Sequence, residues 1–388
     1  MAWLSSDEAL AVLGGKPQTL YANVSRGRIR AKRDPKDSRK SLYNTEDVKR
    51  LAGRRRGRRT VAAVAAETIG WGDPVLSSGV STVIDGRLWY RGRDAVELSE
   101  AATLEDAAAL LWETGRVAFA SPRKVRKPHP ASSGPQEAAF ALLSVRASRD
   151  APSLGRLPGI LSDEAAVIVG ELGAAMLNYA GDGAMMIHQR IAAAWKAPRA
   201  SETIRRALVL LAEHELNAST FAVRVAASTG APLAACLLAG LATLTGPLHG
   251  GASVRMRSLM VSVRRNGPTG AVRDWLAEGH AIPAFGHPLY PDGDIRARVL
   301  LETFQVRPAL ADLGAAVEEL TGEKPNVDFA LLALTDAFDL PETAPLTLFA
   351  IARTVGWIAH LIEQLSTRSV IRPRARYNGP PLVAKTAS

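Results

Sequence analysis

The sequence predicts a mainly α-helical protein that carries a small basic module at its N-terminus. Ala, Leu and Val dominate the composition and aromatic residues make up only 5%, a balance that favours helices over a β-sandwich. From Leu104 onward the apolar residues follow a helical spacing almost to the end of the chain. At 388 residues the chain is longer than one core needs, so we expect two or three domains.

The positive charge is confined to one end of the chain. Residues 1–60 hold 16 Lys and Arg against 6 Asp and Glu, which accounts for the whole net charge of +10. The remaining residues balance at zero. Such a localised excess is typical of a segment that meets a polyanion or has an exposed role of its own.

Cysteine content and hydropathy limit the possible classes. Cys236 is the only cysteine, which excludes a disulfide-stapled secreted protein. The N-terminus carries acids early and has no basic leader. The continuous apolar run 233–244 has the length of a buried core helix, whereas a membrane span needs about 20 residues. We expect a soluble, cytoplasmic protein with no membrane contact.

The N-terminal module predicts three helices and a basic connection. Ser5 and Glu8 form a capping box ahead of an apolar helix that a double glycine ends. A second helix is expected over about 19–26. The basic segment 29–43 suits a loop or a β-wing, and a third helix follows over 45–53.

This order of elements resembles the excisionase and MerR-type winged helix-turn-helix, on the stretches DEALAVLGGKPQTLYANVSRGRIRA and SLYNTEDVKRL. The resemblance implies a domain over 1–53, followed by a basic linker over 54–74, with the second helix in the major groove of DNA. The residues expected to contact DNA are Thr19, Tyr21, Arg26 and Arg28. The competing interpretation is a small basic regulatory or oligomerisation module that touches no nucleic acid.

The sequence of the rest of the chain predicts one β-hairpin followed by helices. Asp85-Gly86 between two short strand-like runs indicates a type I′ hairpin. The Pro-, Lys- and Arg-rich segment 121–136 suits an exposed loop. Helices are expected from Leu104 and over residues 137–148, 163–180, 182–195, 201–216, 221–229, 231–244, 251–265, 271–278, 294–305, 309–322 and 344–364.

Three histidines lie in unusual surroundings: His214 in EHELNAST, His249 in TGPLHGGAS and His287 in PAFGHPLYPDGD. An isolated histidine is more often structural. His249, however, lies at the apparent start of a helix, which keeps the ring neutral, and its neighbouring glycines let a ligand approach. His287 lies in a Gly- and Pro-bounded turn of the kind that forms binding walls.

Other chemistries lack their motifs. HELNAST is not HExxH and no Cys, His and Asp set has zinc-ligand spacing, so no metal site is expected. There is no GxSxG elbow, and Cys236 lies in an apolar helix that disfavours a thiolate. Neither GxxxxGK[ST] nor a strand-linked GxGxxG occurs, which argues against a nucleotide-binding fold.

Residues from about 75 to 382 resemble citrate synthase. The resemblance rests on STVIDGRLWYRGRDAVEL, HELNASTFAVRVAAST, GPLHGGAS, AFGHPLYPDGDIRA, NVDFALLAL, ARTVGWIAHLIEQ and IRPRARYNGP, in the family's order. It implies a nearly all-α homodimer with a large domain over 75–248 and 339–388 and a small domain over 249–338. It also implies condensation of acetyl-CoA or propionyl-CoA with oxaloacetate, with no separate cofactor.

The same motifs imply the site residues. By resemblance, Asp328 takes a proton from the acyl-CoA, His249 hydrogen-bonds the resulting enol or enolate oxygen, and His287 polarises the keto group of the acceptor. Guanidinium groups suit the two carboxylates of a dianionic acceptor. The implied binding residues are His214, Arg296, Arg353 and Arg372, the last supplied by the neighbouring subunit.

Two other functions stay open. The basic N-terminal module favours a DNA-binding regulator whose citrate synthase-like body senses a metabolite. Turns like FGHPLY also occur in citrate-cleaving relatives, so a citryl-CoA-cleaving enzyme is a further alternative. Asp328 argues for catalysis, because a sensor could bind oxaloacetate without a base that generates a carbanion.

Overall fold

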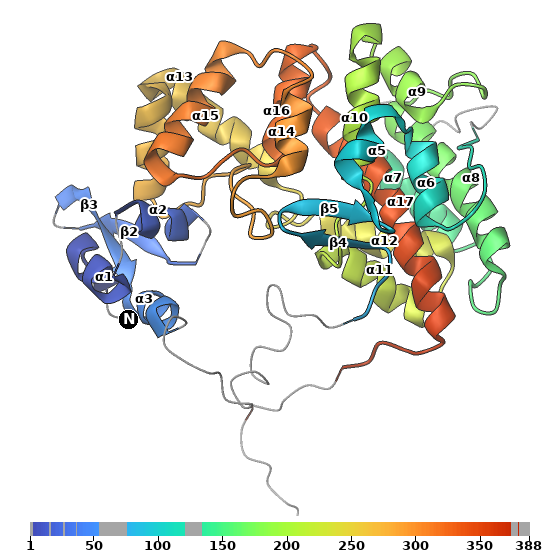
Figure 1. Ribbon diagram of the computed structural model, residues 1–388, viewed down its shortest axis with the longest axis horizontal. Helices are drawn as coiled ribbons and strands as arrows, with labels where there is room; N and C mark the ends of the chain where they lie inside the picture. Colours follow the sequence, from blue (N-terminus) through green and yellow to red (C-terminus); the bar gives the residue numbers. More distant parts are fainter. Residues whose placement is uncertain are drawn as a thin grey trace, which may run out of the picture.

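The computed structural model describes residues 3–14, 17–25, 28–35, 37–53, 76–120, 134–373 and Gly379. Its buried hydrophobic residues fall into three clusters. One lies in the N-terminal module, which we call the head (residues 3–53). The other two, which we call the large core and the small core, lie in the rest of the chain (Figure 1).

The head contains the three helices that its sequence predicts. Its elements are β1 (Trp3–Leu4), α1 (Ser6–Leu13), α2 (Pro17–Ser25), β2 (Ala31–Asp34), β3 (Asp37–Asn44) and α3 (Thr45–Gly53). Ser5 and Glu8 form the expected capping box, and Gly14 ends α1 in the left-handed conformation. The basic segment forms the β2–β3 hairpin. The short β1, which the sequence does not predict, completes a sheet of order β1-β3-β2.

The head closes on an apolar cluster of its own. Leu20 and Val24 lie one helical turn apart on α2 and are both buried, together with Ile29, Tyr43 and Val48. This spacing fixes which face of α2 points into the head.

The rest of the chain, which we call the body (residues 76–373), begins with the predicted hairpin. β4 (Ser81–Ile84) pairs antiparallel with β5 (Arg87–Tyr90), and β6 (Arg93–Asp94) adds a third strand. Asp85 and Gly86 have φ of 51° and 71°, as a type I′ turn requires. The buried Tyr90 hydroxyl donates to the Val209 carbonyl at 3.0 Å, which attaches the hairpin to the large core.

The large core is a set of helices packed around one central helix. The helices are α5 (Ala95–Ala101), α6 (Leu104–Leu111), α7 (Pro135–Ala147), α8 (Pro158–Leu177), α9 (Ile187–Ala194), the short 3-10 helix η1 (Pro198–Ala200), α10 (Ser201–Leu211), α11 (Ala218–Ser228), α12 (Leu233–Leu244) and α17 (Ala344–Thr367). α17 packs against α8, α10, α11 and α12 (Figure 1). Of the described helices, only α17 is long and apolar enough to cross a membrane, and 83% of its apolar window is buried inside the protein, as in the core helix of a globular fold.

The small core is built from α13 (Ala252–Ala277), α14 (Ile295–Leu301), α15 (Pro308–Thr321) and α16 (Val327–Ala337). α13 has non-helical backbone at Gly267, just before Pro268, which separates the two helices that the sequence predicts there. α16 faces both cores, with Leu334 in the large core and Phe329 in the small core. Its first turn therefore lies where groups from both cores can meet.

Three predicted helices extend well beyond those in the structure, and one of them, expected over 294–305, ends at Leu301. The helix expected over 201–216 ends at Leu211. Glu213 and Glu215 then accept hydrogen bonds from β4, so tertiary contacts turn the chain away from the helix axis. The helix expected from residue 182 begins only at Ile187.

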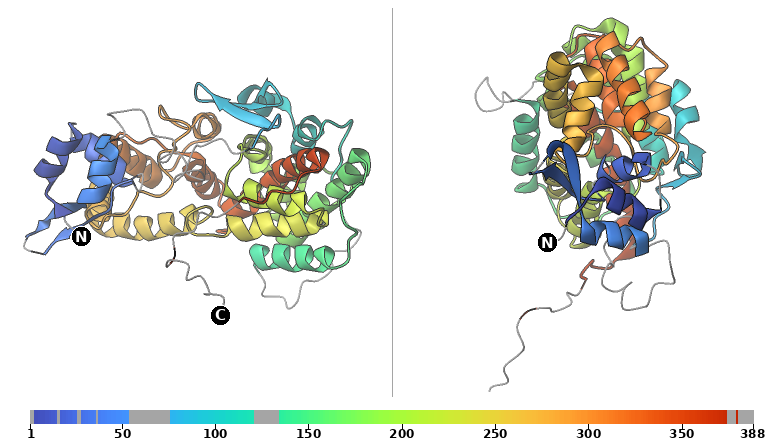
Figure 2. Two further views of the ribbon diagram at one scale, coloured as in Figure 1. Left: turned by 90° about the horizontal axis from the view of Figure 1, so that it is seen from below. Right: turned by 90° about the vertical axis from the view of Figure 1, so that its left-hand side faces the viewer.

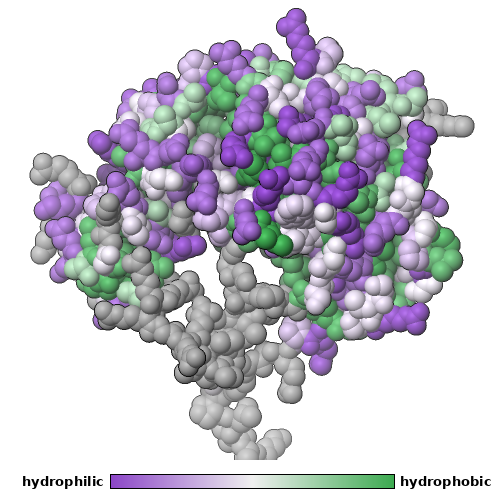
Figure 3. Space-filling model, in the orientation of Figure 1, coloured by the Kyte–Doolittle hydropathy of each residue, from purple (hydrophilic) through white to green (hydrophobic). Residues whose placement is uncertain are grey.

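The segment expected as an exposed loop over 121–136 lies mostly outside the described residues, which resume at Gly134. The molecule is elongated, with the head at one end beside α13 and the large core toward the other (Figure 2). Hydrophilic side chains cover most of the face shown in Figure 3, and hydrophobic ones gather near its middle.

Candidate active site

Three aromatic rings form the centre of the candidate site. His214 follows α10, and His287 and Tyr290 lie in the turn before α14. The ring centroids of His214 and His287 are 5.0 Å apart, and those of His287 and Tyr290 are 5.1 Å apart. The Tyr290 hydroxyl lies 2.9 Å from His214 Nε2. The structure thus brings two of the predicted histidines into contact.

Two antiparallel segments, 282–287 and 323–328, hold His287 and Asp328 in one unit. Their backbone amides at 286 and 326 donate across the pair at 2.9 and 3.0 Å. Asn326 caps α16 by accepting from the Asp328 amide at 3.0 Å. Its Nδ2 also donates to the carbonyl of residue 286 at 3.1 Å. The loop of one candidate and the helix of the other therefore move together.

Asp294 fastens the start of α14 to the start of α16. Its carboxylate caps α14 and accepts from the Val327 amide at 3.0 Å. It also accepts from Arg296 Nε and Nη2 at 2.9 and 2.7 Å. Burial acts to raise the pKa of Asp294, but Arg296 outweighs it and holds that pKa below its usual value. Asp294 is therefore ionised and fixes Arg296.

Arg296, predicted to bind a carboxylate, has one edge of its guanidinium already occupied. The edge of Nε and Nη2 faces Asp294, and the group lies over the Tyr290 ring at 5.1 Å. The end formed by Nη1 and the second Nη2 hydrogen is the part that a ligand can meet. Asp294 thus fixes the orientation of this cation.

Arg353, on α17, is a buried cation with incomplete hydrogen bonding. Its side chain is 1% exposed, and its Nε donates to the Leu211 carbonyl at 3.0 Å. Its Nη2 has no hydrogen-bond partner among the described residues. Leaving a buried donor unpaired costs roughly 1–3 kcal/mol, and more when the group is charged. This atom is therefore a candidate anion-binding point.

His249 lies just before α13 and bonds Ser219 of α11, with Nε2 and Oγ 2.9 Å apart. The same Oγ donates to Asn217 Oδ1 at 2.7 Å and accepts from Trp357 Nε1 at 3.2 Å. Because the hydroxyl has one hydrogen and Asn217 takes it, His249 Nε2 has to be the donor to Ser219. His249 Nδ1 then carries a lone pair. Nδ1 can donate a hydrogen bond only if the Ser219 hydrogen turns toward Nε2, because Nε2 then accepts and the ring proton lies on Nδ1.

All three histidines of the cluster are held neutral. Burial lowers the pKa of His249 to about 4, and Arg353 adds to the effect. Burial also lowers the pKa of His287 to about 4, with Arg296 adding to it. The pKa of His214 is lowered by burial and then by Arg296. The directions agree with the prediction of a neutral imidazole at His249.

Asp328 lies in the first turn of α16. Burial raises the pKa of its carboxyl to about 6, although Arg296 acts to lower it. A carboxylate with a pKa near the working pH is well matched to proton abstraction, because it is still ionised at neutral pH and is a stronger base than an ordinary carboxylate. The position therefore suits a general base.

Six of the seven predicted residues come together within one chain, and Arg372 does not. Electrostatic interactions link the six: His214 interacts with Arg296, His287, Arg353 and His249, and Asp328 interacts with Arg296 and Arg353. Arg372 is exposed in the chain after α17, where the amide of residue 371 donates to Ser228 Oγ at 3.0 Å. Leu248, beside His249, is 93% exposed.

Sequence reasoning missed three residues that shape this site: Tyr290, Asp294 and Ser219. Tyr290 and Asp294 lie in the turn HPLYPDGD, whose high density of special residues marked it as a binding wall. Ser219 lies in HELNAST, two residues before the helix predicted over 221–229, and only the fold places it against His249.

The head residues predicted to contact DNA are separate from this cluster. Thr19 and Arg28 are exposed and Tyr21 is half-buried, whereas Arg26 lies outside the described residues. α2 also packs against α13 and α15 of the small core, so part of its surface is already covered.

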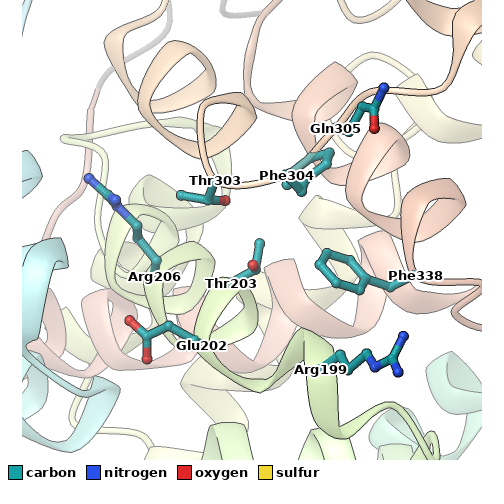
Figure 4. A pocket seen from close by; sticks show the side chains of 8 residues that line it. All are labelled: Arg199, Glu202, Thr203, Arg206, Thr303, Phe304, Gln305 and Phe338. Carbon is teal, nitrogen blue, oxygen red and sulfur yellow. The ribbon is translucent and has the colours of Figure 1, made fainter.

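A cavity of about 510 Å³ lies away from the predicted residues (Figure 4). Its lining residues are Arg199, Glu202, Thr203, Arg206, Thr303, Phe304, Gln305 and Phe338. They lie at the start of α10, after α14 and after α16, whereas His214, Arg296 and Asp328 lie at the opposite ends of those helices. At a rise of 1.5 Å per residue, the 11 residues of α16 separate cavity and site by about 16 Å.

Metal-ligating clusters and the state of the cysteine can also be assessed within the part of the chain that the structure describes. This part holds no group of three or more His, Cys, Asp or Glu side chains that could bind a metal ion. Burial raises the pKa of Cys236 to about 12, so this side chain is a thiol and not a thiolate.

Known proteins resemble the body of the chain. The family model of the citrate synthase C-terminal domain matches residues 70–374. Citrate synthase 2 of Bacillus subtilis is 29% identical over 348 residues, which cover 78% of this chain and 93% of that protein. 2-methylcitrate synthase 2 of Corynebacterium glutamicum is 34% identical over 185 residues, which cover 45% of this chain and 48% of that protein.

Solved structures of citrate synthases superpose on the same part of the chain. Citrate synthase from Thermotoga maritima superposes with a TM-score of 0.64 at 27% identity, covering 82% of this chain and 98% of that one. The Thermoplasma acidophilum enzyme, in ternary complex with carboxymethyl coenzyme A and oxaloacetate, shares the fold with a TM-score of 0.65 at 20% identity, over 83% of this chain and 97% of that one. The matched residues 70–374 hold the whole six-residue cluster, and the chain belongs to the citrate synthase family of acyltransferase-type enzymes.

Proposed function

We propose that the protein condenses acetyl-CoA or propionyl-CoA with oxaloacetate to give citrate or 2-methylcitrate and CoA. Condensation of an acyl-CoA with oxaloacetate is the reaction of the family, and it uses no separate cofactor. One observation carries the proposal for this chain: a carboxylate with a raised pKa, Asp328, shares a site with neutral histidines and two buried arginines. A pure binding site for a dianion has no use for such a base.

The first step forms the nucleophile. Asp328 takes a proton from the carbon next to the thioester carbonyl, and the C–H electron pair moves to form an enol or enolate. His249, neutral at pH 7, stabilises the oxygen of this intermediate by donating from Nδ1. That requires the Ser219 hydrogen to turn from Asn217 to His249 Nε2. A hydrogen-bond donor at such an oxygen contributes roughly 3–4 kcal/mol.

The second step forms the carbon–carbon bond. The enolate carbon attacks the keto carbon of oxaloacetate, and the C=O electron pair moves to the oxygen that His287 polarises. The alkoxide formed takes up one proton, which balances the proton that Asp328 removed and later gives up. Arg353 Nη2 and the free end of Arg296 bind the two carboxylates, and His214 completes the acceptor site. The charge on both arginines is desolvated, so each contact is stronger than at the surface. Water then hydrolyses the thioester, which releases CoA and a proton.

The experiment is a thiol-release assay with oxaloacetate, run in parallel with acetyl-CoA and propionyl-CoA. Release of CoA that depends on oxaloacetate supports the proposal, and the ratio of kcat/KM values chooses the acyl group. One methylene in an apolar pocket changes that ratio by about 10- to 200-fold. If neither acetyl-CoA nor propionyl-CoA releases CoA and the protein cleaves citryl-CoA, the citrate-cleaving alternative is identified instead.

The proposal includes a homodimer in which Arg372 completes the neighbouring site, with a large domain over 75–248 and 339–388 and a small domain over 249–338. Its support is an apolar surface around α7 and α8, where Val145, Leu154, Leu157 and Ile160 are 44–68% exposed. Several large apolar side chains exposed along neighbouring elements favour a covered face. Arg372→Ala and Asp328→Asn chains, refolded together, should regain part of the activity. Hybrid dimers without recovery would place Arg372 in its own subunit's site.

A second candidate function is DNA binding by the head. It is favoured by the charge excess of residues 1–60 and by the exposure of Thr19 and Arg28. The full-length protein should then shift duplex DNA with a steep salt dependence, about −0.9 in log K per neutralised phosphate. The absence of any shift at about 50 mM salt would leave the head with a protein-contacting role only.

A further inference from the structure

The head is anchored to the small core by a buried serine. Ser25, the last residue of α2, is 4% exposed. Its hydroxyl donates to Glu323 Oε2 at 2.6 Å and accepts from the Ile282 amide at 3.3 Å. A buried hydrogen bond to a carboxylate is among the stronger polar contacts in proteins. The contact therefore joins two parts of the chain that are nearly 300 residues apart.

The surfaces around this contact fit closely. α2 packs against α13 and α15, and the head lies directly beside α13 in Figures 1 and 2. A Cβ on Gly279 would lie 2.1 Å from the Ala31 carbonyl oxygen of β2, so only glycine allows this approach. Arg33 lies 3.8 and 3.7 Å from carboxylates of Asp274 and Glu278. These exposed pairs contribute little energy but match the basic head to an acidic edge.

The two partners of Ser25 lie on the two segments that carry the active site. Ile282 begins the segment 282–287, which ends at His287, and Glu323 begins the segment 323–328, which ends at Asp328. The segments bond to each other through their backbones. One hydroxyl of the head therefore spans both strands of the unit that holds the acceptor-polarising histidine and the base.

Glu323 also contacts the active-site loop directly. A Cβ on Gly286 would lie 2.8–2.9 Å from the Glu323 carboxylate, so the two groups are already in close contact. Gly286 immediately precedes His287 and has φ of 67°. A change in the position of Glu323 therefore acts on the backbone next to His287.

We propose that the head is a docking domain for the small core, and that Ser25 is a positioning residue that holds the segments of His287 and Asp328 in their working register. Docking of the head then sets the turnover of the site. The part of this inference that concerns turnover rests on the proposed condensation, whereas the part that concerns docking does not.

The test compares Ser25→Ala with Ser162→Ala in the full-length protein. Ser162 is also buried, at 5% exposed, but its hydroxyl bonds only the Pro158 carbonyl of its own helix. Hydrogen exchange should become faster at the amides of 282, 286 and 326 in Ser25→Ala and stay unchanged there in Ser162→Ala. This readout needs no enzymatic activity.

In the thiol-release assay, Ser25→Ala should lower kcat by about three- to tenfold with little change in the KM for oxaloacetate. Misplacement of catalytic groups by a fraction of an ångström has effects of this size or larger. Ser25→Thr, which keeps the hydroxyl, should restore most of the loss. Unchanged exchange in Ser25→Ala would overturn the docking, and faster exchange with unchanged kcat would overturn the positioning role.

A second variant protects the test if Ser25→Ala does not fold. Gly279→Ala places a methyl against the Ala31 carbonyl and should undock the head, with the same pattern of faster exchange. Gly155→Ala is its control, because Gly155 has a similar φ of 76° and open space around it, whereas Gly279 has φ of 80°. Equal exchange in the two glycine variants would overturn the docking.

Discussion

Two buried arginines of the large core differ in what surrounds them. Arg224 on α11 and Arg353 on α17 are each 1% exposed. Arg224 meets the Glu363 carboxylate at 2.5 Å, the Gln364 amide oxygen at 3.0 Å and His360 Nδ1 at 3.2 Å. Arg353 bonds one backbone carbonyl, and its Nη2 has no partner among the described residues.

This difference in hydrogen-bond partners distinguishes an arginine that stabilises the fold from an arginine that can bind a ligand. A buried charge is stable in a fold when a counter-charge and hydrogen bonds compensate it, as Glu363 and Gln364 do for Arg224. A buried cation with an unused donor lowers the stability of the empty protein and gains that energy back when an anion binds. Burial lowers the pKa of Arg353, which is the sign of a charge that the fold alone does not compensate.

Replacing Arg353 gives the largest expected effect on function. Arg353→Met keeps the length of the side chain and removes the anion-binding group. We expect kcat/KM for oxaloacetate to fall by about 10³-fold, since losing one partner of a buried charged hydrogen bond costs 2–5 kcal/mol. The free energy of unfolding of the ligand-free protein should stay equal or rise. Urea denaturation beside steady-state kinetics measures both, and a large loss of stability would make Arg353 a second scaffold residue.

Arg224→Met is the matched variant with the opposite outcome. It leaves Glu363 without its main cation, and we expect the free energy of unfolding to fall by about 3 kcal/mol, the lower end of the range for broken buried pairs. The lower end applies because the Glu363 side chain is still 17% exposed. Turnover per folded molecule should stay within about twofold of the wild type. A drop in turnover without a drop in stability would contradict the distinction.

Local features of this fold could be predicted from the sequence because their causes are local. The Ser5 and Glu8 capping box and the Asp85-Gly86 turn need only neighbouring residues. The motifs of a known family predict the six gathered site residues, and local context also indicates His249 and His287. Arg224 was not singled out, because nothing in FAVRVAAST shows that Glu363 and Gln364 will lie against it.

The end of α10 shows that contacts distant in the sequence also decide where a helix stops. The apolar spacing predicts a helix through residue 216, but contacts of Glu213 and Glu215 with β4 stop it at Leu211. The docking of Ser25 against Glu323 is likewise a contact between two parts of the chain that have separate hydrophobic cores. Sequence patterns reveal the elements and the types of residue for chemistry, whereas long-range polar pairs emerge only from the packing.

Asp328→Asn tests the proposed general base that acts beside the anion-binding Arg353. The amide keeps the shape of the side chain but cannot accept the proton, so kcat should fall by 10²-fold or more. Oxaloacetate binding, followed by calorimetry, should be nearly unchanged because the arginines remain. The raised pKa adds a second readout: the folded protein loses stability as pH rises from about 3.8 to about 6. The variant should lack that loss, and turnover within threefold of the wild type would exclude Asp328 as the base.

The smallest expected effect is the pH dependence of the intact protein. If Asp328 acts as the base with a pKa of about 6, only about a tenth of it is ionised at pH 5, so kcat/KM should fall about tenfold between pH 7 and pH 5. His249 and His287, with pKa values of about 4, stay neutral over that range and add no second transition. Circular dichroism at pH 5 controls for unfolding. A profile that is flat to pH 5 would mean that Asp328 has the acidity of an exposed carboxyl. A transition near 6.5 that persists in the residual activity of Asp328→Asn would assign the proton to a histidine.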